Sequence, residues 1–301
     1  MPGCDFWRFQ RVRQLRPCIF DAADIAVLSR VTLGADVAVT SVIIDGLKRR
    51  FPQARIWFVG PRKNYELFAA DERVGHVPLE YPRRGSIQER ISVAQSLVLP
   101  DEALVIDPDS RITQLGLVPV SKERNYFLFE SRSFEEQSID PLPVLAARWC
   151  EQVFGAKDAR AYIAPASTVP GADTAISLGV GGNEAKRLDA AFERQLVTEA
   201  AARGSVLIDR GASDEEMDRV DRAAEGLPVT AFTGSFADFA GAISRSGRYL
   251  GYDSAGQHVA ACCGVPLTVY FTGSVNQRFR QRWRPHGPGP IQVISEPPAG
   301  R

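Results

Sequence analysis

A carboxylate stands shortly after the first strongly apolar run of the chain. Asp36 follows the run 25–31 and the short sequence Thr-Leu-Gly-Ala, in which Gly34 can accommodate a tight turn. An Asp at this position can cap the helix that follows, and spacing alone favours that role. It can also accept the proton of a substrate hydroxyl as a general base. The residues by themselves leave both roles open.

A second polar group follows the apolar run Ala-Leu-Val-Ile near residue 105. Asp107, Asp109 and Arg111 occur in the sequence Asp-Pro-Asp-Ser-Arg, with Thr113 two residues further on. Side chains of this kind at a strand end can bind a substrate that carries hydroxyl groups. They can equally hold the loop together through an Asp–Arg pair. The pattern supports both interpretations.

A glycine-rich turn opens the second half of the chain. Gly181 lies in the sequence Gly-Val-Gly-Gly, and Lys186 and Arg187 follow it, where we expect the first turn of a long helix. Positive charge there opposes the helix dipole, which indicates a bound anion. The turn lacks Gly-Lys-Ser/Thr, and Glu184 stands where a dinucleotide fingerprint has its last glycine. A plain glycine turn remains the alternative.

The most informative stretch is Gly-Tyr-Asp-Ser-Ala-Gly-Gln-His. Backbone N–H groups at the start of a helix expected near Gln257 can bind an anion. Asp253 can accept hydrogen bonds from sugar or ribose hydroxyls, as acidic residues after nucleotide-binding strands do. A capped helix with a buried His258 is the alternative, and for His258 itself we favour that core role. The candidate residues are Asp253, Ser254, Ala255, Gly256 and His258.

Short β-branched runs alternate with helical stretches along the whole chain, which predicts βαβ units and parallel sheets. The proline- and serine-rich stretch 164–174 has the composition of a linker. We therefore expect an α/β protein with two Rossmann-like domains, 1–165 and 175–301. The expected strands are 25–31, 54–60, 74–80, 102–108, 126–130, 175–180, 205–211, 228–234, 248–253 and 266–273. The main expected helices are 36–51, 65–70, 86–99, 141–155, 183–204, 213–226 and 235–247. Every polar turn described above falls at the carboxyl end of an expected strand, where such sheets bind ligands.

Composition excludes several classes of function. Lys and Arg total 36, as do Asp and Glu, so no general positive charge is available for nucleic acid, and we expect at most peripheral membrane contact. No apolar run approaches the ~20 residues of a membrane span. The N-terminal stretch has no apolar core of a signal peptide, which predicts a cytoplasmic protein. The three histidines lack metal-ligand spacing, so we expect no metal and no cofactor.

The sequence resembles glycosyltransferase family nine, the heptosyltransferase-like group. The early match is Leu-Gly-Ala-Asp-Val-Ala-Val-Thr, with a helix that ends in a basic-Phe-Pro run. The late match is Asp-Ser-Ala-Gly-Gln-His-Val-Ala-Ala followed by Gly-Val-Pro, and Ala-Lys-Arg-Leu lies between them. The matches extend from about Ile25 to Gly287. Two departures are visible: Ala35 stands where the family has a glycine before the Asp, and Ser-Ala-Gly replaces Ser/Thr-Gly.

The resemblance implies a GT-B fold, in which two Rossmann-like domains with parallel sheets face each other across a cleft. It implies an inverting, metal-independent transfer of a sugar from a nucleotide-diphosphate sugar, of the ADP-heptose type, to a hydroxyl of a glycan or lipopolysaccharide-type acceptor. Asp36 matches the family's proposed catalytic base. On this reasoning, an Asp36 side chain far from the cleft or turned toward the interior would mean that the transferase account has to be given up. The residues matched to sugar-donor binding are Gly181, Lys186, Arg187, Asp253, Ser254, Ala255, Gly256 and His258. Those expected near the acceptor are Gly34, Asp107, Asp109 and Arg111.

Two other functions remain open at this point. One is a non-catalytic relative that binds a sugar nucleotide, and the other is a sugar-nucleotide epimerase of the same fold. Turnover of the sugar donor separates the first from a transferase. Product formation without an added acceptor identifies the second. A dinucleotide dehydrogenase is disfavoured, because no complete phosphate-binding fingerprint follows the first strand.

Overall fold

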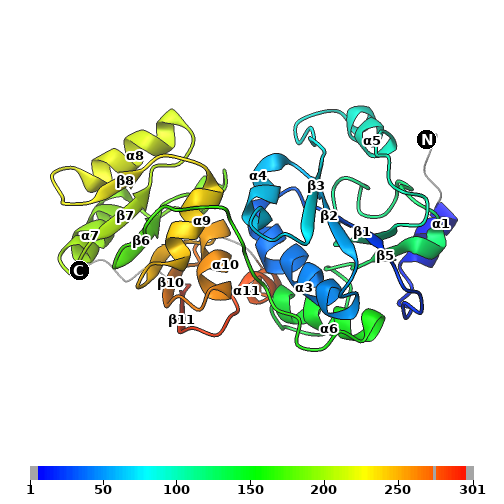
Figure 1. The fold of residues 1–301 in the computed structure, drawn as a ribbon. Coiled ribbons are helices and arrows are strands. Elements are labelled where there is room, and N and C mark those ends of the chain that lie inside the picture. The colour runs from blue at the N-terminus through cyan, green and yellow to red at the C-terminus, as the bar shows by residue number, and fades with distance from the viewer. Residues whose placement is uncertain (1–5, 274–275, 296–301) are drawn as a thin grey trace. The chain divides into compact units, whose positions relative to one another are not determined.

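The computed structural model describes residues 6–273 and 276–295 of the 301-residue chain. The chain forms two compact units, Met1–Ala164 and Pro165–Arg301. We call them the N-terminal and the C-terminal unit. Each contains one parallel sheet with helices packed against it (Figure 1).

The sheet of the N-terminal unit has the strand order β3-β2-β1-β4-β5, and all neighbouring strands are parallel. Ile25 of β1 lies opposite Ile56 on one side and Leu104 on the other. The central strands are apolar because both faces of the sheet are covered. The strands are β1 (Asp24–Leu28), β2 (Arg55–Gly60), β3 (Val74–Pro78), β4 (Leu104–Asp107) and β5 (Tyr126–Leu128).

Helices α3 and α6 lie side by side in this unit (Figure 1). Gly46 of α3 permits their close approach, because a Cβ there would lie 3.0 Å from the Cβ of Cys150. Helix α6 ends at Gly155, which has a left-handed backbone with φ of 67°. The helical elements are α1 (Phe6–Val12), α2 (Leu33–Ala35), η1 (Asp36–Thr40), α3 (Ser41–Arg50), α4 (Arg62–Tyr65), η2 (Glu66–Phe68), α5 (Ile87–Gln95), η3 (Glu123–Asn125) and α6 (Leu142–Phe154).

The first long helix begins earlier than its sequence pattern predicts. It runs without interruption from Leu33 to Arg50, and residues Asp36–Thr40 form a π-helical segment. Asp36 is therefore inside the helix, and the prediction that it caps the helix is wrong. π-Helical segments are rare and occur often at functional sites.

The sheet of the C-terminal unit has the order β11-β10-β9-β6-β7-β8, again with all pairs parallel. Renumbered within the unit, this is the 3-2-1-4-5-6 order of a dinucleotide-binding Rossmann fold. The strands are β6 (Thr174–Ser177), β7 (Val206–Asp209), β8 (Thr230–Phe232), β9 (Tyr249–Tyr252), β10 (Leu267–Tyr270) and β11 (Ile291–Ile294).

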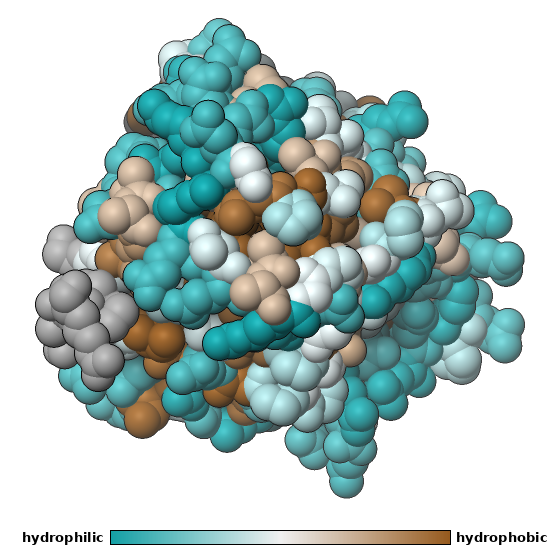
Figure 2. Space-filling view, turned by 90° about the vertical axis from the view of Figure 1, so that its left-hand side faces the viewer, coloured by the Kyte–Doolittle hydropathy of each residue, from teal (hydrophilic) through white to brown (hydrophobic). Residues whose placement is uncertain are grey.

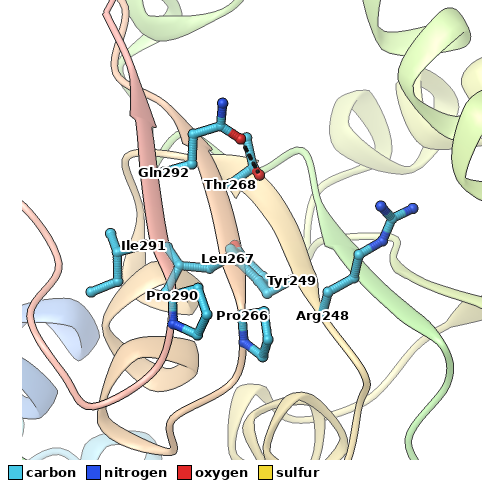
Figure 3. A pocket seen from close by; sticks show the side chains of 8 residues that line it. All are labelled: Arg248, Tyr249, Pro266, Leu267, Thr268, Pro290, Ile291 and Gln292. Atoms are coloured by element: carbon cyan, nitrogen blue, oxygen red, sulfur yellow. Dashed lines mark hydrogen bonds between the residues drawn. The ribbon is translucent and has the colours of Figure 1, made fainter.

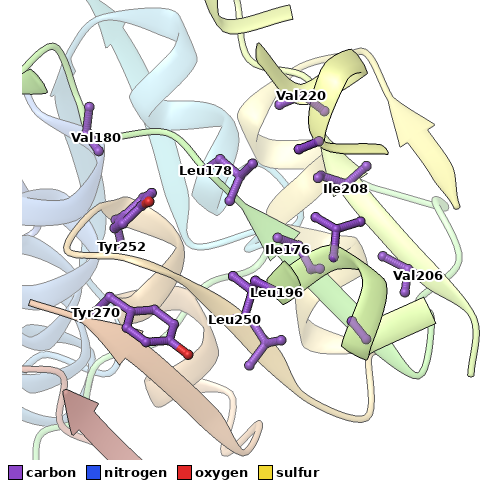
Figure 4. Close-up of a cluster of buried hydrophobic side chains, with 13 residues drawn as sticks. Ile176, Leu178, Val180, Leu196, Val206, Ile208, Val220, Leu250, Tyr252 and Tyr270 are labelled. Carbon is purple, nitrogen blue, oxygen red and sulfur yellow. The ribbon is translucent and has the colours of Figure 1, made fainter. Parts of the chain in front are cut away.

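The core of the C-terminal unit forms where its strands meet two helices. Ile176 and Leu178, Ile208, and Leu250 come from neighbouring parts of the sheet, and Leu196 comes from α7 (Figure 4). These side chains are buried, which removes apolar surface from water. The helical elements are η4 (Glu184–Lys186), α7 (Ala190–Ala201), α8 (Asp214–Ala224), α9 (Phe236–Ser244), α10 (Ala255–Cys262) and α11 (Gln277–Trp283).

Two sequence predictions for this unit are wrong in detail. Helix α7 begins at Ala190, because the Asp189 side chain accepts a hydrogen bond from Phe192 N and caps it. Lys186 and Arg187 therefore precede the helix. Strand β11 was not predicted. It is a short strand at the edge of the sheet, and Gln292 interrupts its apolar residues, so the sequence signal is weak.

The N-terminal arm forms helix α1 against the N-terminal unit. Arg8 donates to the carbonyl of Gly116, and Arg11 pairs with Glu123 at 2.8 Å. No helix in the described part of the chain combines the length and apolar character needed to cross a bilayer. On the face shown in Figure 2, hydrophilic residues surround a smaller hydrophobic area.

Candidate active site

In each sheet, the strand order reverses at one pair of adjacent central strands. In the N-terminal unit this pair is β1 and β4, and in the C-terminal unit it is β6 and β9. Parallel α/β sheets bind ligands in the crevice beyond the carboxyl ends of such a pair. Residues that the sequence singled out follow each of these four strands.

Asp36 lies in the interior of the N-terminal unit, with 0% of its surface exposed. Its Oδ1 accepts hydrogen bonds from Arg30 N at 2.8 Å and from Thr40 Oγ1 at 2.6 Å. Its Oδ2 accepts from Ser29 Oγ and from Asn64 Nδ2, both at 2.6 Å. An ionised carboxylate has about four acceptor positions, and all are occupied. The expectation that this carboxylate faces a substrate is not met.

The four partners explain how a carboxylate remains at this depth. Burial raises the pKa of Asp36, and the hydrogen bonds from Ser29, Thr40, Arg30 and Asn64 act to lower it. Thr40 is brought into place by the π-helical segment that begins at Asp36 itself. Sequence reasoning missed these partners, since Asn64 lies 28 residues away and only the fold brings it close.

Asp107 ends β4 and is also buried. Ser110 N donates to its Oδ1 at 2.6 Å, while the hydroxyls of Thr113 and Tyr126 donate to its Oδ2. Burial raises the pKa of Asp107 to about 6; these hydrogen bonds act to lower it, and the neighbouring Asp109 contributes to raising it. Asp107 therefore holds the loop after β4 in shape.

Asp109 has a different environment in the same loop. Its backbone is left-handed, with φ of 66°, an uncommon conformation for a residue other than glycine. Ser131 Oγ donates to its Oδ2 at 2.7 Å, and the Arg30 guanidinium lies 3.9 Å from that oxygen. Arg30 is anchored in turn by a 2.8 Å hydrogen bond to the carbonyl of Pro108. The β1 and β4 loops are thus joined by one arginine.

The other two candidates of this unit have simpler environments. Gly34 lies within α2 and has no left-handed backbone; the left-handed residue before this helix is Val31, with φ of 65°. The tight turn that was expected at Gly34 is therefore at Val31. Arg111 is exposed on the surface of the loop after β4. The Asp–Arg contact of this loop is made by Arg30 and Asp109 rather than by Arg111.

In the C-terminal unit, Lys186 and Asp253 form an ion pair at the carboxyl ends of β6 and β9. Lys186 Nζ lies 2.6 Å from Asp253 Oδ2 and 3.0 Å from the Asp253 carbonyl oxygen. Gln257 Nε2 donates to Asp253 Oδ1 at 2.6 Å, and its own Oε1 is buried without a partner among the described residues. The structure thus brings together two candidates separated by 67 residues.

The start of helix α10 has no side-chain cap. Ser254 is the N-cap residue, but its side chain makes no capping hydrogen bond. Among the described helices, five are capped by a Ser, Asp or Asn side chain, while α2, α4 and α6 also lack a side-chain cap. The N–H groups of Ala255 and Gly256 therefore lie in a first turn with no side-chain oxygen bound to it, a position that favours an anion.

His258 packs in the interior of the same unit and is 5% exposed. Burial lowers its pKa to about 4, although Asp253 acts to raise it, so the imidazole is neutral at pH 7. Its ring contacts Trp283 edge-on, with ring centroids 6.1 Å apart. These contacts suit the core role that the sequence favoured.

The glycine-rich turn after β6 is shaped by backbone conformation and by Arg187. Gly181 has φ of 63°, and its surroundings are open. Arg187 donates to the carbonyl of Leu178 at 2.7 Å and pairs with Glu184 at 2.5 Å. Arg187 therefore closes the turn, while Lys186 is the residue that reaches the end of β9.

A surface pocket in the C-terminal unit lies at the wrong edge of the sheet for this site (Figure 3). Tyr249, Leu267 and Ile291, three of its lining residues, are the first residues of β9, β10 and β11. The pocket thus lies at the amino ends of these strands. The candidate residues lie at carboxyl ends, where parallel sheets bind ligands. No group of three or more His, Cys, Asp or Glu suited to a metal ion occurs within residues 6–273 and 276–295.

Comparison with known proteins identifies the fold. No protein-family model and no curated protein matches the chain. Among solved structures, it is similar to a family 9 glycosyl transferase from Veillonella parvula DSM 2008, with a TM-score of 0.68, 16% identity and coverage of 95% of this chain and 90% of that chain. It is similar to the E. coli heptosyltransferase WaaC solved with ADP, with a TM-score of 0.66, 15% identity and coverage of 91% and 93%. A third is the E. coli ADP-heptose lps heptosyltransferase II, with a TM-score of 0.61, 16% identity and coverage of 92% and 91%.

The TM-scores show that the fold is shared, in agreement with the strand orders of both sheets. The chain therefore has the α/β GT-B fold, with two Rossmann-like units, of the heptosyltransferase-like glycosyltransferases of family nine.

Proposed function

We propose that this protein is a glycosyltransferase that moves a sugar from a nucleotide-diphosphate sugar, of the ADP-heptose type, to a hydroxyl of a glycan or lipopolysaccharide-type acceptor. The observation that carries the proposal is the Lys186–Asp253 pair beside the uncapped start of α10, at the strand pair β6/β9. The E. coli heptosyltransferase WaaC, to which the chain is similar in fold, was solved with ADP.

The C-terminal unit supplies the charge for the leaving diphosphate. Lys186 and the first-turn N–H groups of α10 stabilise negative charge that grows on the diphosphate oxygens. Groups that are positioned before the reaction provide the largest contribution of this kind. Asp253 accepts hydrogen bonds from hydroxyl groups of the sugar donor, and Gln257 holds the Asp253 carboxylate in place. In this account no divalent metal takes part.

The N-terminal unit binds the acceptor at the ends of β1 and β4. The acceptor oxygen forms a bond to the anomeric carbon on the face opposite the diphosphate, as the bond from that carbon to the diphosphate oxygen breaks. The configuration at the anomeric carbon is inverted, and the hydroxyl proton moves to a carboxylate. A positioned base accelerates such a step by about 10²–10⁴-fold.

The test is a binding and turnover experiment with one substitution. ADP-, GDP- and UDP-sugars are compared by thermal shift, and the best of them is then incubated with deacylated lipopolysaccharide core. We expect ADP-heptose to stabilise the protein and ADP to be released only when the acceptor gains one sugar by mass. Lys186→Met should weaken ADP binding about 10- to 100-fold, the value of one charge-assisted hydrogen bond of about 1.5–3 kcal/mol. Lys157→Met, on the surface, is the matched control.

A second candidate function rests on the environment of Asp36. In a non-catalytic relative that only binds the sugar nucleotide, the carboxylate at the family's base position is free to become structural, and Asp36 is fully occupied by its four partners. Binding of ADP-heptose with no ADP release and no acceptor product under any acceptor condition supports this candidate. Isomerisation of the sugar nucleotide without acceptor identifies an epimerase instead.

A further inference from the structure

Lys186 belongs to a segment that has little regular structure of its own. Before α7 begins at Ala190, the segment forms one short helical turn, η4 (Glu184–Lys186), and residues 181–185 are exposed. Holding such a segment in one conformation costs backbone entropy, so contacts from other elements must offset that cost. The structure shows which contacts these are.

The hydroxyl of Tyr252 fixes the chain two residues after Lys186. Tyr252 is the last residue of β9, is 1% exposed, and lies in the core of the C-terminal unit (Figure 4). Its hydroxyl accepts a hydrogen bond from Leu188 N at 3.1 Å and donates one to Glu193 Oε1 at 2.8 Å. Burial raises the pKa of Tyr252 above its usual value, so the hydroxyl keeps the proton that this donation needs.

A buried ion pair fixes the Tyr252 hydroxyl in turn. Glu193 of α7 is 1% exposed, and Arg219 Nε of α8 lies 2.6 Å from its Oε2. Arg219 Nη2 also donates to the carbonyl of Leu188 at 3.0 Å. The N–H and the C=O of Leu188 are therefore bound by two side chains that share one carboxylate. Charge-assisted hydrogen bonds of this kind are short and directional, so they define the position of Leu188.

A separate contact just after β10 holds Lys186 itself. Thr272 Oγ1 donates to the carbonyl of Lys186. Gly273 permits the close approach of the two chain segments, because a Cβ there would lie 2.9 Å from the carbonyl oxygen of Ala185. Residues from β9, α7, α8 and the chain after β10 thus determine where the backbone of Lys186 lies.

We propose that Tyr252 is a positioning residue for diphosphate binding, because through Leu188 it holds the segment from which the Lys186 ammonium reaches the leaving diphosphate. Thr272 has the same role at the Lys186 carbonyl. The inference rests on the proposed function. A cation whose backbone is already ordered loses less conformational entropy when it binds phosphate oxygens. Neither hydroxyl contacts the diphosphate in this account, and both act through Lys186.

The experiment is a double-mutant cycle on the Kd for ADP, measured by calorimetric titration of the full chain. Tyr252→Phe should raise the Kd for ADP about 3- to 10-fold, the effect of one neutral hydrogen bond. The Kd for adenosine, which has no phosphate, should stay within twofold. In Lys186→Met, the same substitution should change the Kd for ADP less than twofold, because the group through which it acts is gone. Tyr270→Phe, in the same core, is the matched control and should leave both Kd values unchanged.

Thr272→Val is the second variant, and it carries the same cycle with Lys186→Met if Tyr252→Phe does not fold. The positioning role is wrong, and the proposed function stands, if the wild-type protein binds ADP and the folded variants keep its Kd within twofold. It is also wrong if the variants lose as much affinity for adenosine as for ADP, or lose affinity for ADP equally with and without Lys186, since a general structural defect gives these results. If the wild-type protein binds no ADP, the proposed function fails, and the role of Tyr252 fails with it.

Discussion

How a carboxylate acts depends on how many of its lone pairs the fold has already occupied. Asp36 has two hydrogen-bond donors on each oxygen, so it stabilises the helix start and the end of β1 at once. Among the described residues, the Asp109 carboxylate has one hydrogen-bond donor, Ser131 Oγ. Both residues follow a central strand, and spacing alone cannot separate them. The distinction lies in side chains such as Asn64 and Ser131, which the fold brings from elsewhere in the chain.

Asp36→Asn should destabilise the protein, whatever its effect on turnover. The amide keeps one oxygen and turns an NH₂ group toward two of the four hydrogen-bond donors, which leaves buried donors unpaired. We expect a loss of about 1–3 kcal/mol in the free energy of unfolding, measured in urea. Asp21→Asn is the control, since the Asp21 side chain is 92% exposed and such changes stay within about 0.5 kcal/mol. Equal stabilities would contradict the structural role of Asp36.

Asp107 predicts a pH dependence of stability. Its pKa in the folded protein is about 6. Its pKa in an unfolded chain is about 3.9, so between these values the folded state holds a proton that the unfolded state has lost. The contribution to stability is complete below about pH 4 and is lost as the pH rises through 6, with a slope of up to about 1.4 kcal/mol per pH unit. Urea unfolding from pH 4.5 to pH 7 measures it.

The matched variant for this pH dependence is Asp107→Asn, which does not titrate. As the pH falls from 7 to 4.5, the unfolding free energy of the wild type should increase relative to that of the variant. Two parallel curves would show that Asp107 is ionised throughout. Asp101→Asn should follow the wild-type curve, because its side chain is on the surface.

At the level of elements, most strands and helices could be predicted from the alternation of apolar runs, since parallel strands buried on both faces give a strong signal. The start of α7 could not. The stretch after Gly182 has helical composition, but Asp189 caps the helix and the preceding residues turn toward β9. The π-helical segment at Asp36 is equally invisible, because it depends on the contacts of Asp36 and Thr40.

Helix α10 depends on a glycine in its first turn. A Cβ at Gly256 would lie 2.3 Å from the hydroxyl oxygen of Tyr249, which is closer than atoms can approach. Gly256→Ala should therefore displace the start of the helix, with a loss of about 1–3 kcal/mol of stability and weaker ADP binding. Gly179→Ala is the control for stability without ADP, because the nearest neighbour of its new Cβ would be 3.5 Å away. The measurement is urea unfolding with and without ADP.

A second substitution tests the cause of this effect. Tyr249→Phe removes the hydroxyl that the new Cβ would meet, although the ring carbon at 2.7 Å stays. Combined with Gly256→Ala, it should restore part of the lost stability, so the two changes are not additive. Strict additivity would place the damage of Gly256→Ala elsewhere than at Tyr249.

At the level of the whole molecule, each unit has its own sheet and its own core, and the site residues divide between them. Binding of ADP should therefore be a local event in the C-terminal unit. At about 100 times its Kd, ADP adds roughly 2.7 kcal/mol of stability to the state that binds it. We expect slower amide hydrogen exchange in residues 178–188 and 253–258, which contain the Lys186–Asp253 pair and the start of α10. Adenosine, which has no phosphate, should leave exchange there unchanged, and so should ADP added to Lys186→Met at the same concentration.

Residues 29–36 and 107–113 should exchange at their ligand-free rates, because they form the acceptor side of the proposed reaction. Protection by ADP in these segments of the N-terminal unit, without protection at 253–258, would reverse the assignment of the two units.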